Sequence, residues 1–531
     1  MLRKNISKII FASVLTSSSA LAQSIPNELL QNPNSPVVTV GGFINFSAVT
    51  RSQSKAYSQD RLPDSVLDSH GKVDVDNNDD THNTLGTHNR YSNKNDFVND
   101  SEIYIKVGAI SDSGLKYGAI VELEADTSPN GRGNGFNADK SFIFTESKAG
   151  KFEFGNNLAA NQKMKVGPAI FARAAGGING KYLEHINLPQ LAHSTQSENG
   201  NACSGGVNVG VDGSTTGATN CNNVKLPRFI LIPQSPVGHG GYAKGFYNNT
   251  SDTDYSIDDV GGNHGSFNRN SLVQGGNGLN YKNGAFGQME DATKISYYTP
   301  RVNGWQIGAS FVPDTGDTGT SAVISGKDSG DIKNVVSWGL NYSNNMGNLG
   351  VAMSATGESG QFENSKLKAT DPTAQINRDR LNSYDAGLMF TYFGFTVGGS
   401  YGYWGNSLQP NKGIYSCDYD STENLSAQDC SSTTTKKKFK NASYYTGGAA
   451  YEFGPFAASW TYISSKFQNN KYQAHSFGID YKLARGLMPY VEFTKFKFDS
   501  NQPKALNITR GSNQVFNNTG YVGLIGILFA F

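Results

Sequence analysis

The sequence predicts an all-β fold: a transmembrane antiparallel β-barrel of sixteen strands. Two observations predict it. Segments of about ten residues with alternating apolar and polar side chains recur from residue 37 to the C-terminus, and the connectors between them alternate between short and long. The composition agrees, because 37% hydrophobic and 17% charged residues with 61 glycines suit strands and turns. An apolar run of about 20 residues, which a membrane-spanning helix needs, is missing from the sequence.

The N-terminus has the pattern of a secretory signal peptide, predicted over 1–22. Three basic residues precede a short apolar stretch at 9–15, and small residues at 20–22 form a cleavage site. A short buried or interfacial helix is the alternative. We expect 23–36 to be a short periplasmic segment and 37–531 to be the barrel. Removal of the signal peptide 1–22 leaves 42 basic and 44 acidic residues, and this near balance argues against a nucleic-acid binder with a broad basic face.

The predicted strands and connectors follow from this alternation. Seven connectors are short and contain the Gly, Pro, Asn and Asp residues of hairpin turns, whereas the others are mostly long and polar. This asymmetry predicts short periplasmic turns and long extracellular loops. The strands are expected at 37–50, 98–110, 115–125, 140–147, 151–156, 292–299, 305–313, 334–343, 349–357, 382–392, 395–405, 443–453, 456–467, 472–484, 487–498 and 520–531.

Each strand places apolar and polar residues on opposite faces. In the second segment, Ile103, Ile105 and Val107 share one face, and Glu102 and Lys106 share the other. A soluble sandwich would show the same alternation. The polar face and the unequal connectors favour a barrel with a lipid-facing exterior and a polar interior, because lipid-facing and lumen-facing residues alternate in such barrels.

The segment 487–498 departs from this pattern. Val491 and Phe493 share a face with Lys495 and Lys497. Either a β-bulge or the exit of the strand from the lipid layer would explain two lysines there, and both interpretations remain open.

The last strand ends in a pattern typical of outer-membrane proteins. Tyr521, Phe529 and Phe531 lie on one face of an alternating segment that finishes with a terminal Phe. We expect these residues to form the assembly signal that the barrel-assembly machinery reads. Together with the signal peptide, they predict the outer membrane of a Gram-negative bacterium.

In strand order and loop placement, the chain resembles the general porins of Gram-negative bacteria. The local resemblance is strongest in 115–124, 151–156, 481–493 and 521–531. The resemblance implies a homotrimer that lets ions and small hydrophilic solutes diffuse passively. It also implies that the loop after the fifth strand, 157–291, folds partly into the pore. Neither a cofactor nor a catalytic activity is expected.

Charged residues predicted to face the pore are the candidate functional residues. Acidic and basic groups on opposite walls would set a transverse field that orients polar solutes. The alternative is that they are solvated wall residues with little individual effect. From the strands they are Lys106, Lys116, Glu122, Glu124, Lys151, Glu153, Asp480 and Lys482, with Glu102, Lys294 and Glu492 on the same faces. From the inward-folded stretch 167–189 they are Arg173, Lys181 and Glu184.

Four cysteines form two local pairs in polar stretches. An exported chain enters an oxidising compartment, so we expect two loop disulfides. Three pairings are possible, and Cys203 with Cys221 and Cys417 with Cys430 are favoured because short loops close readily. A metal site is not expected, because the spacing of zinc ligands is missing.

A basic run in the loop 406–442 suggests a lipid partner. Lys436, Lys437, Lys438 and Lys440 lie on the long-loop side, where phosphates of lipopolysaccharide would be, although a solvated basic face is the alternative.

Three rival functions remain open. The long loops could plug the pore of a surface adhesin or receptor. An outer-membrane enzyme is disfavoured because a plausible nucleophile and base pair is missing. A secreted soluble β-protein is disfavoured by the terminal Phe and the unequal connectors.

Overall fold

The computed structural model describes residues 36–53, 94–125, 137–168, 171–186, 292–314, 332–362, 380–405, 407, 442–467, 470–499 and 518–531. Sixteen strands lie within these ranges. They are β1 (Val37–Ser52), β2 (Asn95–Ile110), β3 (Lys116–Glu124), β4 (Asn137–Ser147), β5 (Gly150–Asn156), β6 (Thr293–Tyr298), β7 (Trp305–Asp314), β8 (Ile332–Met346), β9 (Leu349–Phe362), β10 (Leu381–Tyr392), β11 (Phe395–Gly405), β12 (Ala442–Phe453), β13 (Phe456–Phe467), β14 (Asn470–Tyr481), β15 (Leu487–Asp499) and β16 (Asn518–Ala530).

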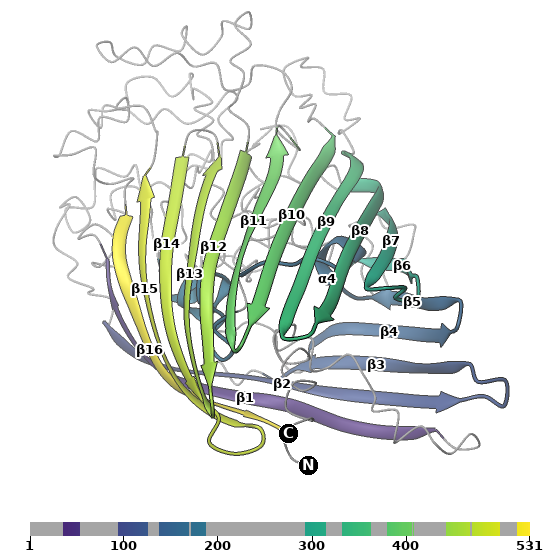
Figure 1. Cartoon of the computed structure of the whole chain (residues 1–531), viewed down its shortest axis with the longest axis horizontal. Coiled ribbons are helices and arrows are strands. Elements are labelled where there is room, and N and C mark those ends of the chain that lie inside the picture. Colours follow the sequence, from purple (N-terminus) through teal and green to yellow (C-terminus); the bar gives the residue numbers. More distant parts are fainter. Residues whose placement is uncertain are drawn as a thin grey trace, which may run out of the picture.

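The strands form one closed antiparallel barrel (Figure 1). Each strand pairs with its neighbours in sequence, and β1 pairs with β16 from Phe43↔Ala530 to Ser52↔Tyr521. Phe531 continues this ladder, because its N–H donates to the Gly42 carbonyl at 3.0 Å. Closure leaves no unpaired edge strand, which a membrane barrel requires. The predicted sixteen-stranded barrel is confirmed.

The connectors at one end of the barrel are tight turns. The loop between β10 and β11 has only two residues, Phe393 and Gly394, with φ of 46° and 82°. Positive φ at both positions is the geometry of a type I′ hairpin turn, which matches the twist of the flanking strands. At the other end, 53–94, 157–292 and 406–441 separate consecutive strands, and the two residues between β13 and β14 are the short exception that the sequence also indicated.

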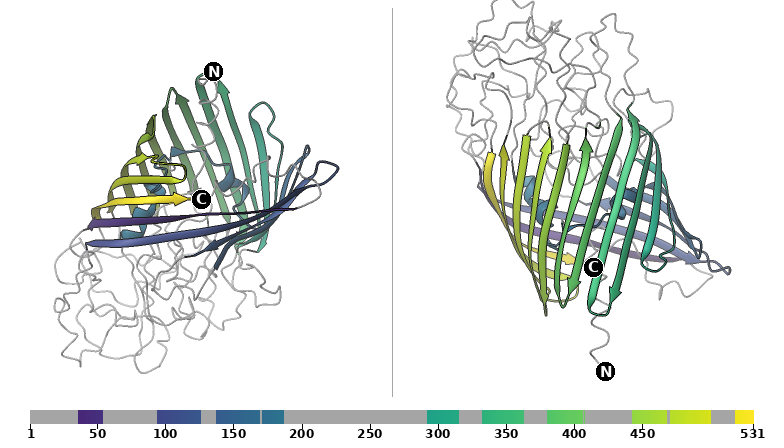
Figure 2. Two further views of the ribbon diagram at one scale, coloured as in Figure 1. Left: turned by 90° about the horizontal axis from the view of Figure 1, so that it is seen from below. Right: turned by 45° about the horizontal axis from the view of Figure 1, so that its top comes forward.

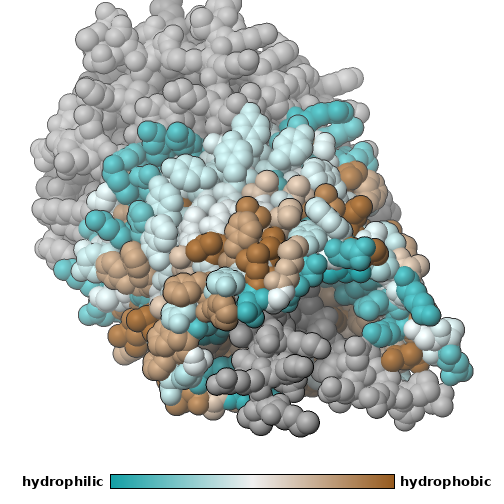
Figure 3. All heavy atoms as spheres, in the orientation of Figure 1, coloured by the Kyte–Doolittle hydropathy of each residue, from teal (hydrophilic) through white to brown (hydrophobic). Residues whose placement is uncertain are grey.

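Side chains on β15 show how the wall separates lipid from interior. Val491 and Phe493 are 49% and 44% exposed on the outer face, whereas Glu492 is 1% exposed on the inner face. The ladders of β15 with β14 and β16 run without a register shift past Lys495 and Lys497. A β-bulge therefore does not explain these lysines, and they continue on the outer face towards the long-connector end. Figure 3 shows apolar residues gathered on the outer face below hydrophilic ones.

A segment of the connector between β5 and β6 lies inside the barrel (Figure 2). We call residues 157–168 and 171–186 the inner segment. It contains the short helix α4 (Ala160–Lys163) and the 3-10 turns η3 (Gly177–Asn179) and η4 (Lys181–His185). α4 contacts β6–β9, η3 contacts β13–β15 and η4 contacts β16, so the segment follows the wall around the interior. The inner segment begins at residue 157, ten residues before the stretch 167–189 that the sequence predicted to fold into the pore.

In the described ranges, the helices are all too short or too polar to cross a membrane.

Candidate functional site

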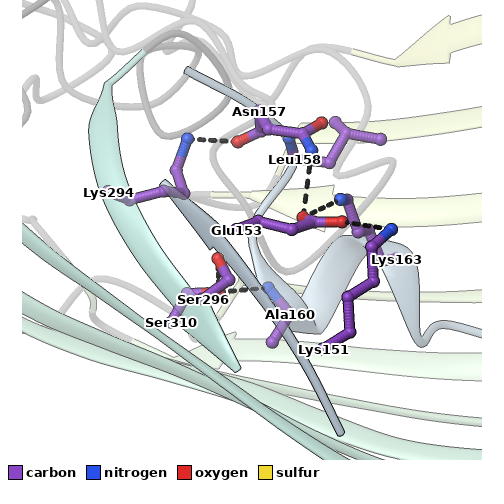
Figure 4. A network of polar contacts seen from close by, with 9 residues as sticks. All are labelled: Lys151, Glu153, Asn157, Leu158, Ala160, Lys163, Lys294, Ser296 and Ser310. Atoms are coloured by element: carbon purple, nitrogen blue, oxygen red, sulfur yellow. Dashed lines mark hydrogen bonds and ion pairs between the residues drawn. The ribbon is translucent and has the colours of Figure 1, made fainter. Parts of the chain in front are cut away.

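The inner segment begins at a buried carboxylate on β5. Glu153 is 3% exposed, and its carboxylate pairs with Lys151 at 2.8 Å and with Lys163 of α4. The amide of Asn157 donates to the same carboxylate at 3.0 Å, and Lys294 donates to the Asn157 carbonyl (Figure 4). Burial lowers the pKa of the loop residue Lys163 to about 8, and the Glu153 charge partly opposes this shift. A buried charge needs such partners, so this cluster fixes the start of the segment.

Wall hydroxyls satisfy the main chain of the first part of the inner segment. α4 is a single turn: the N–H groups of Gln162 and Lys163 donate to the Ala159 carbonyl, whereas those of Ala160 and Asn161 have no partner within the turn. Inward-facing serines accept these two, Ser310 from Ala160 (2.8 Å) and Ser337 from Asn161 (3.0 Å), and Ser354 accepts the N–H of Val166 beyond the helix (2.8 Å). The segment is therefore anchored to β7, β8 and β9 through its backbone.

Asn161 adds a side-chain bridge to the same wall. The Ser337 hydroxyl donates to its Oδ1 at 2.6 Å, and its amide donates to Glu358 on β9 at 3.3 Å. Ser383 on β10 donates to the other oxygen of Glu358 at 3.0 Å. Glu358 is 1% exposed, so these contacts replace the water that a carboxyl group would otherwise bind.

Glycines on the inner face let the segment approach the wall. A Cβ on Gly339 would lie 2.8 Å from Cβ of Met164, and one on Gly387 would overlap the carbonyl oxygen of Val166. Met164 is buried against Tyr298, and the missing side chain of Gly339 leaves the space that Met164 occupies at the wall.

A buried ion pair holds the middle of the segment. Lys165 Nζ lies 3.4 Å from Asp385 Oδ2 on β10, and the Asp385 side chain is 0% exposed. The Tyr444 hydroxyl of β12 donates to the same carboxylate, and its ring lies 4.8 Å from Lys165 Nζ. The Asp385 charge is thus compensated by a loop cation and a phenol, as burial of a charge demands.

Carboxylates also anchor the second half of the segment. Arg173 lies 3.6 Å from Glu452 and 3.8 Å from Asp480, and its N–H donates to Asp480 at 3.2 Å. The N–H of Gly177 donates to Glu492 at 2.9 Å. The segment here meets β12, β14 and β15.

The segment ends against the first strands. Lys181 forms an ion pair with Asp100 on β2, and the hydroxyls of Tyr182 and Tyr472 lie 2.9 Å apart. The carbonyl of His185 accepts a hydrogen bond from Arg51 of β1 at 3.4 Å. The anchored chain has therefore followed the wall from β5 to β1 and β2.

The two parts of the inner wall differ in charge. The mixed wall, the inner face of β2–β6, carries both signs, and pairs form within it, such as Lys140 with Glu122 at 2.6 Å. The acidic wall is the inner face of β9–β15. Within the described residues its acidic and basic side chains all carry carboxyl groups, namely Glu358, Asp385, Glu452, Asp480 and Glu492.

The predicted pore residues are only partly brought together. On the inner face or the inner segment lie Lys106, Glu122, Lys151, Glu153, Arg173, Lys181 and Asp480, together with Lys294 and Glu492. Lys116 lies near the turn end, 3.6 Å from Glu146. Lys482 is one residue beyond the end of β14, in the turn that follows it, and its side chain is exposed. Its N–H donates to the carbonyl of Pro455 in the neighbouring turn, so it lies at the short-turn end of the barrel.

Other predictions fall outside the described residues. These are the side chains of Glu124 and Glu184, the signal peptide and the lysines 436–440. The four cysteines, Cys203, Cys221, Cys417 and Cys430, fall there too, so their pairing stays a prediction.

Several site residues were missed by the sequence analysis. The inward parity of β4, β9, β10 and β12 could have indicated Lys140, Glu358, Asp385 and Glu452. The loop cations Lys163 and Lys165 had no periodic signal. In the described part of the chain, His, Cys, Asp and Glu side chains form no cluster that could hold a metal ion.

Comparison with known proteins identifies a family. The profile of Gram-negative porins matches residues 10–226 and 240–501. An uncharacterized protein of Rickettsia bellii is 28% identical over 281 residues, and one of Rickettsia prowazekii is 27% identical over 285 residues. Each of these matches covers 46% of this chain and 58% of the relative.

Solved barrels of low sequence identity also match. A variant of Rhodopseudomonas blastica porin is 11% identical with a TM-score of 0.42, and the match covers 93% of this chain and 100% of that chain. An anion-selective porin of Comamonas acidovorans is 13% identical with a TM-score of 0.43, covering 94% and 100%.

Proposed function

Since the chain belongs to the Gram-negative porin family and is an outer-membrane channel, we propose that ions and small hydrophilic solutes diffuse passively through it. The observation that carries this proposal is the course of the inner segment along the wall. Its cations keep part of their surface accessible, with Lys165 at 14%, Lys181 at 16% and Arg173 at 19%. A water-filled channel lined by partly exposed charges suits hydrophilic solutes and opposes apolar ones.

The charge difference between the walls supports a transverse field. The mixed wall carries Lys106, Lys140 and Lys294 beside acidic partners such as Glu122 and Glu153, whereas five carboxyl groups and no basic side chain of the described strands face inward on the acidic wall. In the low-dielectric surroundings of a protein pore, such separation of charge orients a dipolar solute across the channel. The inner segment moderates this field, because Lys165 and Arg173 approach the acidic wall.

Three partners belong to the same proposal. The outer face carries Tyr521, Phe529 and Phe531, exposed by 43%, 44% and 56%, which suits recognition by the barrel-assembly machinery. The lysines 436–440 are proposed to contact lipopolysaccharide, and the barrel is proposed to assemble as a homotrimer. The last proposal rests on the resemblance to general porins.

The test is conductance in a planar bilayer with a salt gradient. Purified protein whose gel migration changes on heating, as for a folded barrel, is added to one side. We expect large, stable openings that close in three equal steps, and the reversal potential gives the charge preference. Silence from such folded protein would overturn the diffusion channel and favour a plugged barrel that acts as a surface receptor.

A further inference from the structure

The inner segment covers most of the charge of the acidic wall, because it lies between this wall and the centre of the barrel (Figure 2). Four of the five carboxyl groups of the wall contact the segment, and each of these residues is at most 3% exposed. The contacts are Glu358 with Asn161, Asp385 with Lys165, Asp480 with Arg173 and Glu492 with Gly177. A solute on this side of the channel therefore meets mainly the surface of the inner segment.

The inner segment presents positive charge on that surface. Among its side chains that the structure describes, those of the Lys, Arg, Asp and Glu types are all basic, namely Lys163, Lys165, Arg173 and Lys181. Lys165 keeps 14% of its side chain exposed, whereas its partner Asp385 keeps none. Arg173 keeps 19%, against 3% for Asp480, although its second partner Glu452 keeps 25%. The cation of the Lys165–Asp385 pair is thus accessible and the carboxylate is not.

The start of the inner segment shows the same order of exposure. Lys151 keeps 24% of its side chain exposed, whereas Glu153, which lies between Lys151 and Lys163, keeps 3% (Figure 4). Lys181 and Asp100 are an exception, because the carboxylate there is the more exposed partner, at 28% against 16%. An ion pair of which only the cation is accessible acts on a passing ion as a dipole with its positive end towards the channel.

We propose that the channel prefers small anions over cations, and that the accessible cations Lys151, Lys165 and Arg173 set this preference. The inference rests on the proposed diffusion function, since it names the solutes that pass. The five carboxyl groups of the acidic wall would by themselves favour cations, but four of them lie behind the inner segment. Coulomb energy falls with distance and salt screens it, so the accessible cations act more strongly on a passing ion than the covered carboxylates. Basic side chains that line a pore select anions.

The test uses double variants that each lose one charge of either sign, so the net charge of the protein stays the same. Lys165→Gln with Asp385→Asn removes an accessible cation and a covered carboxylate. The matched control is Lys140→Gln with Glu122→Gln, an ion pair of the mixed wall whose side chains are 6% and 3% exposed. Folding is checked by heat-dependent gel migration. If the first variant does not fold, Lys151→Gln takes its place, because Glu153 then keeps Lys163.

Reversal potentials in a gradient of KCl give the ratio of chloride to potassium permeability. Burial lowers the pKa of Lys163 and of Lys165, so the measurement is made at pH 6, which favours their charged forms. We expect a ratio of about two or more for the wild type and the control, and a ratio closer to one for Lys165→Gln with Asp385→Asn or for Lys151→Gln.

The outcomes separate this inference from the proposed function. Open channels of the wild type that prefer potassium, or that show no preference, would overturn the anion preference and leave passive diffusion in place. An unchanged ratio in the Lys165→Gln, Asp385→Asn variant, or an equal fall in the control, would overturn the role of the accessible cations. Folded wild-type protein that gives no conductance would overturn the diffusion function itself.

Discussion

The mixed wall and the acidic wall solve the problem of buried charge in different ways. On the mixed wall, Lys140 and Glu122 lie 2.6 Å apart and Lys151 and Glu153 lie 2.8 Å apart, so the strands balance much of their own charge. On the acidic wall the partners come from the inner segment, as with Lys165 and Asp385. Charge balance on the acidic wall therefore depends on the inner segment, whereas the mixed wall supplies much of its own counter-charge.

The largest effect is expected from removing a loop cation on the acidic side. Lys165→Met leaves the Asp385 side chain, 0% exposed, with the Tyr444 hydroxyl but without its cation. Loss of one partner of a buried ion pair costs about 3 kcal/mol. We expect the free energy of unfolding in urea, measured on barrels in lipid vesicles, to fall by about that amount.

Lys151→Met on the mixed wall is the matched control. Glu153 keeps Lys163 and Asn157 there, so the loss should be less than half as large. Equal losses for both variants would remove the distinction between the two walls.

A carboxylate that accepts a main-chain hydrogen bond should come next. Glu492→Ala removes the acceptor of the Gly177 N–H, which lies 2.9 Å away. A buried donor without a partner costs about 2 kcal/mol. We expect the second half of the inner segment to loosen, seen as larger fluctuations of single-channel current. Glu492→Gln keeps an acceptor oxygen, so its single-channel current should fluctuate no more than that of the wild type. If both substitutions behave alike, the hydrogen bond does not hold the segment.

The serine anchors should have smaller individual effects. Ser354→Ala leaves the Val166 N–H without its 2.8 Å acceptor, for a loss of about 1 kcal/mol in unfolding free energy. Ser359→Ala on the exposed face of the same strand is the control, and it should change stability by less than about 0.5 kcal/mol. A loss at position 359 as large as that at 354 would contradict an anchoring role.

The smallest effect is a change of charge with pH. Because burial lowers the pKa of Lys163 to about 8, this residue loses its positive charge as pH rises from 7 to 9. The loop beside the mixed wall then becomes more negative, so the reversal potential should move towards cation preference with a midpoint near pH 8. Lys163→Met should already show part of the high-pH preference at pH 7, and its shift between pH 7 and 9 should be smaller than that of the wild type. A shift of undiminished size in this variant would assign the transition to other groups.

The strands of this barrel could be predicted from the amino-acid sequence alone. Period-two alternation is a local property, since lipid and lumen select each side chain according to the face on which it lies. For this reason Val491 and Phe493 were placed on the outside and Glu492 on the inside, and strands such as β11 and β13 were predicted within their observed bounds. The interpretation of Lys495 and Lys497 needed the ladder, because only the register shows that β15 has no bulge.

The course of the inner segment could not be predicted from the sequence, because it depends on contacts made when the barrel closes. Its partners are far apart in sequence, as with Asn161 and Ser337, which are 176 residues apart, and Gly177 and Glu492, which are 315 residues apart. A loop without periodicity carries no signal for which wall side chains will satisfy its backbone. The contacts of α4 with Ser310, and the seat that Gly339 offers to Met164, exist because barrel closure brings those strands around the loop. Alternation predicts which side chains face inward, but the residues of the inner segment that they contact depend on closure of the barrel.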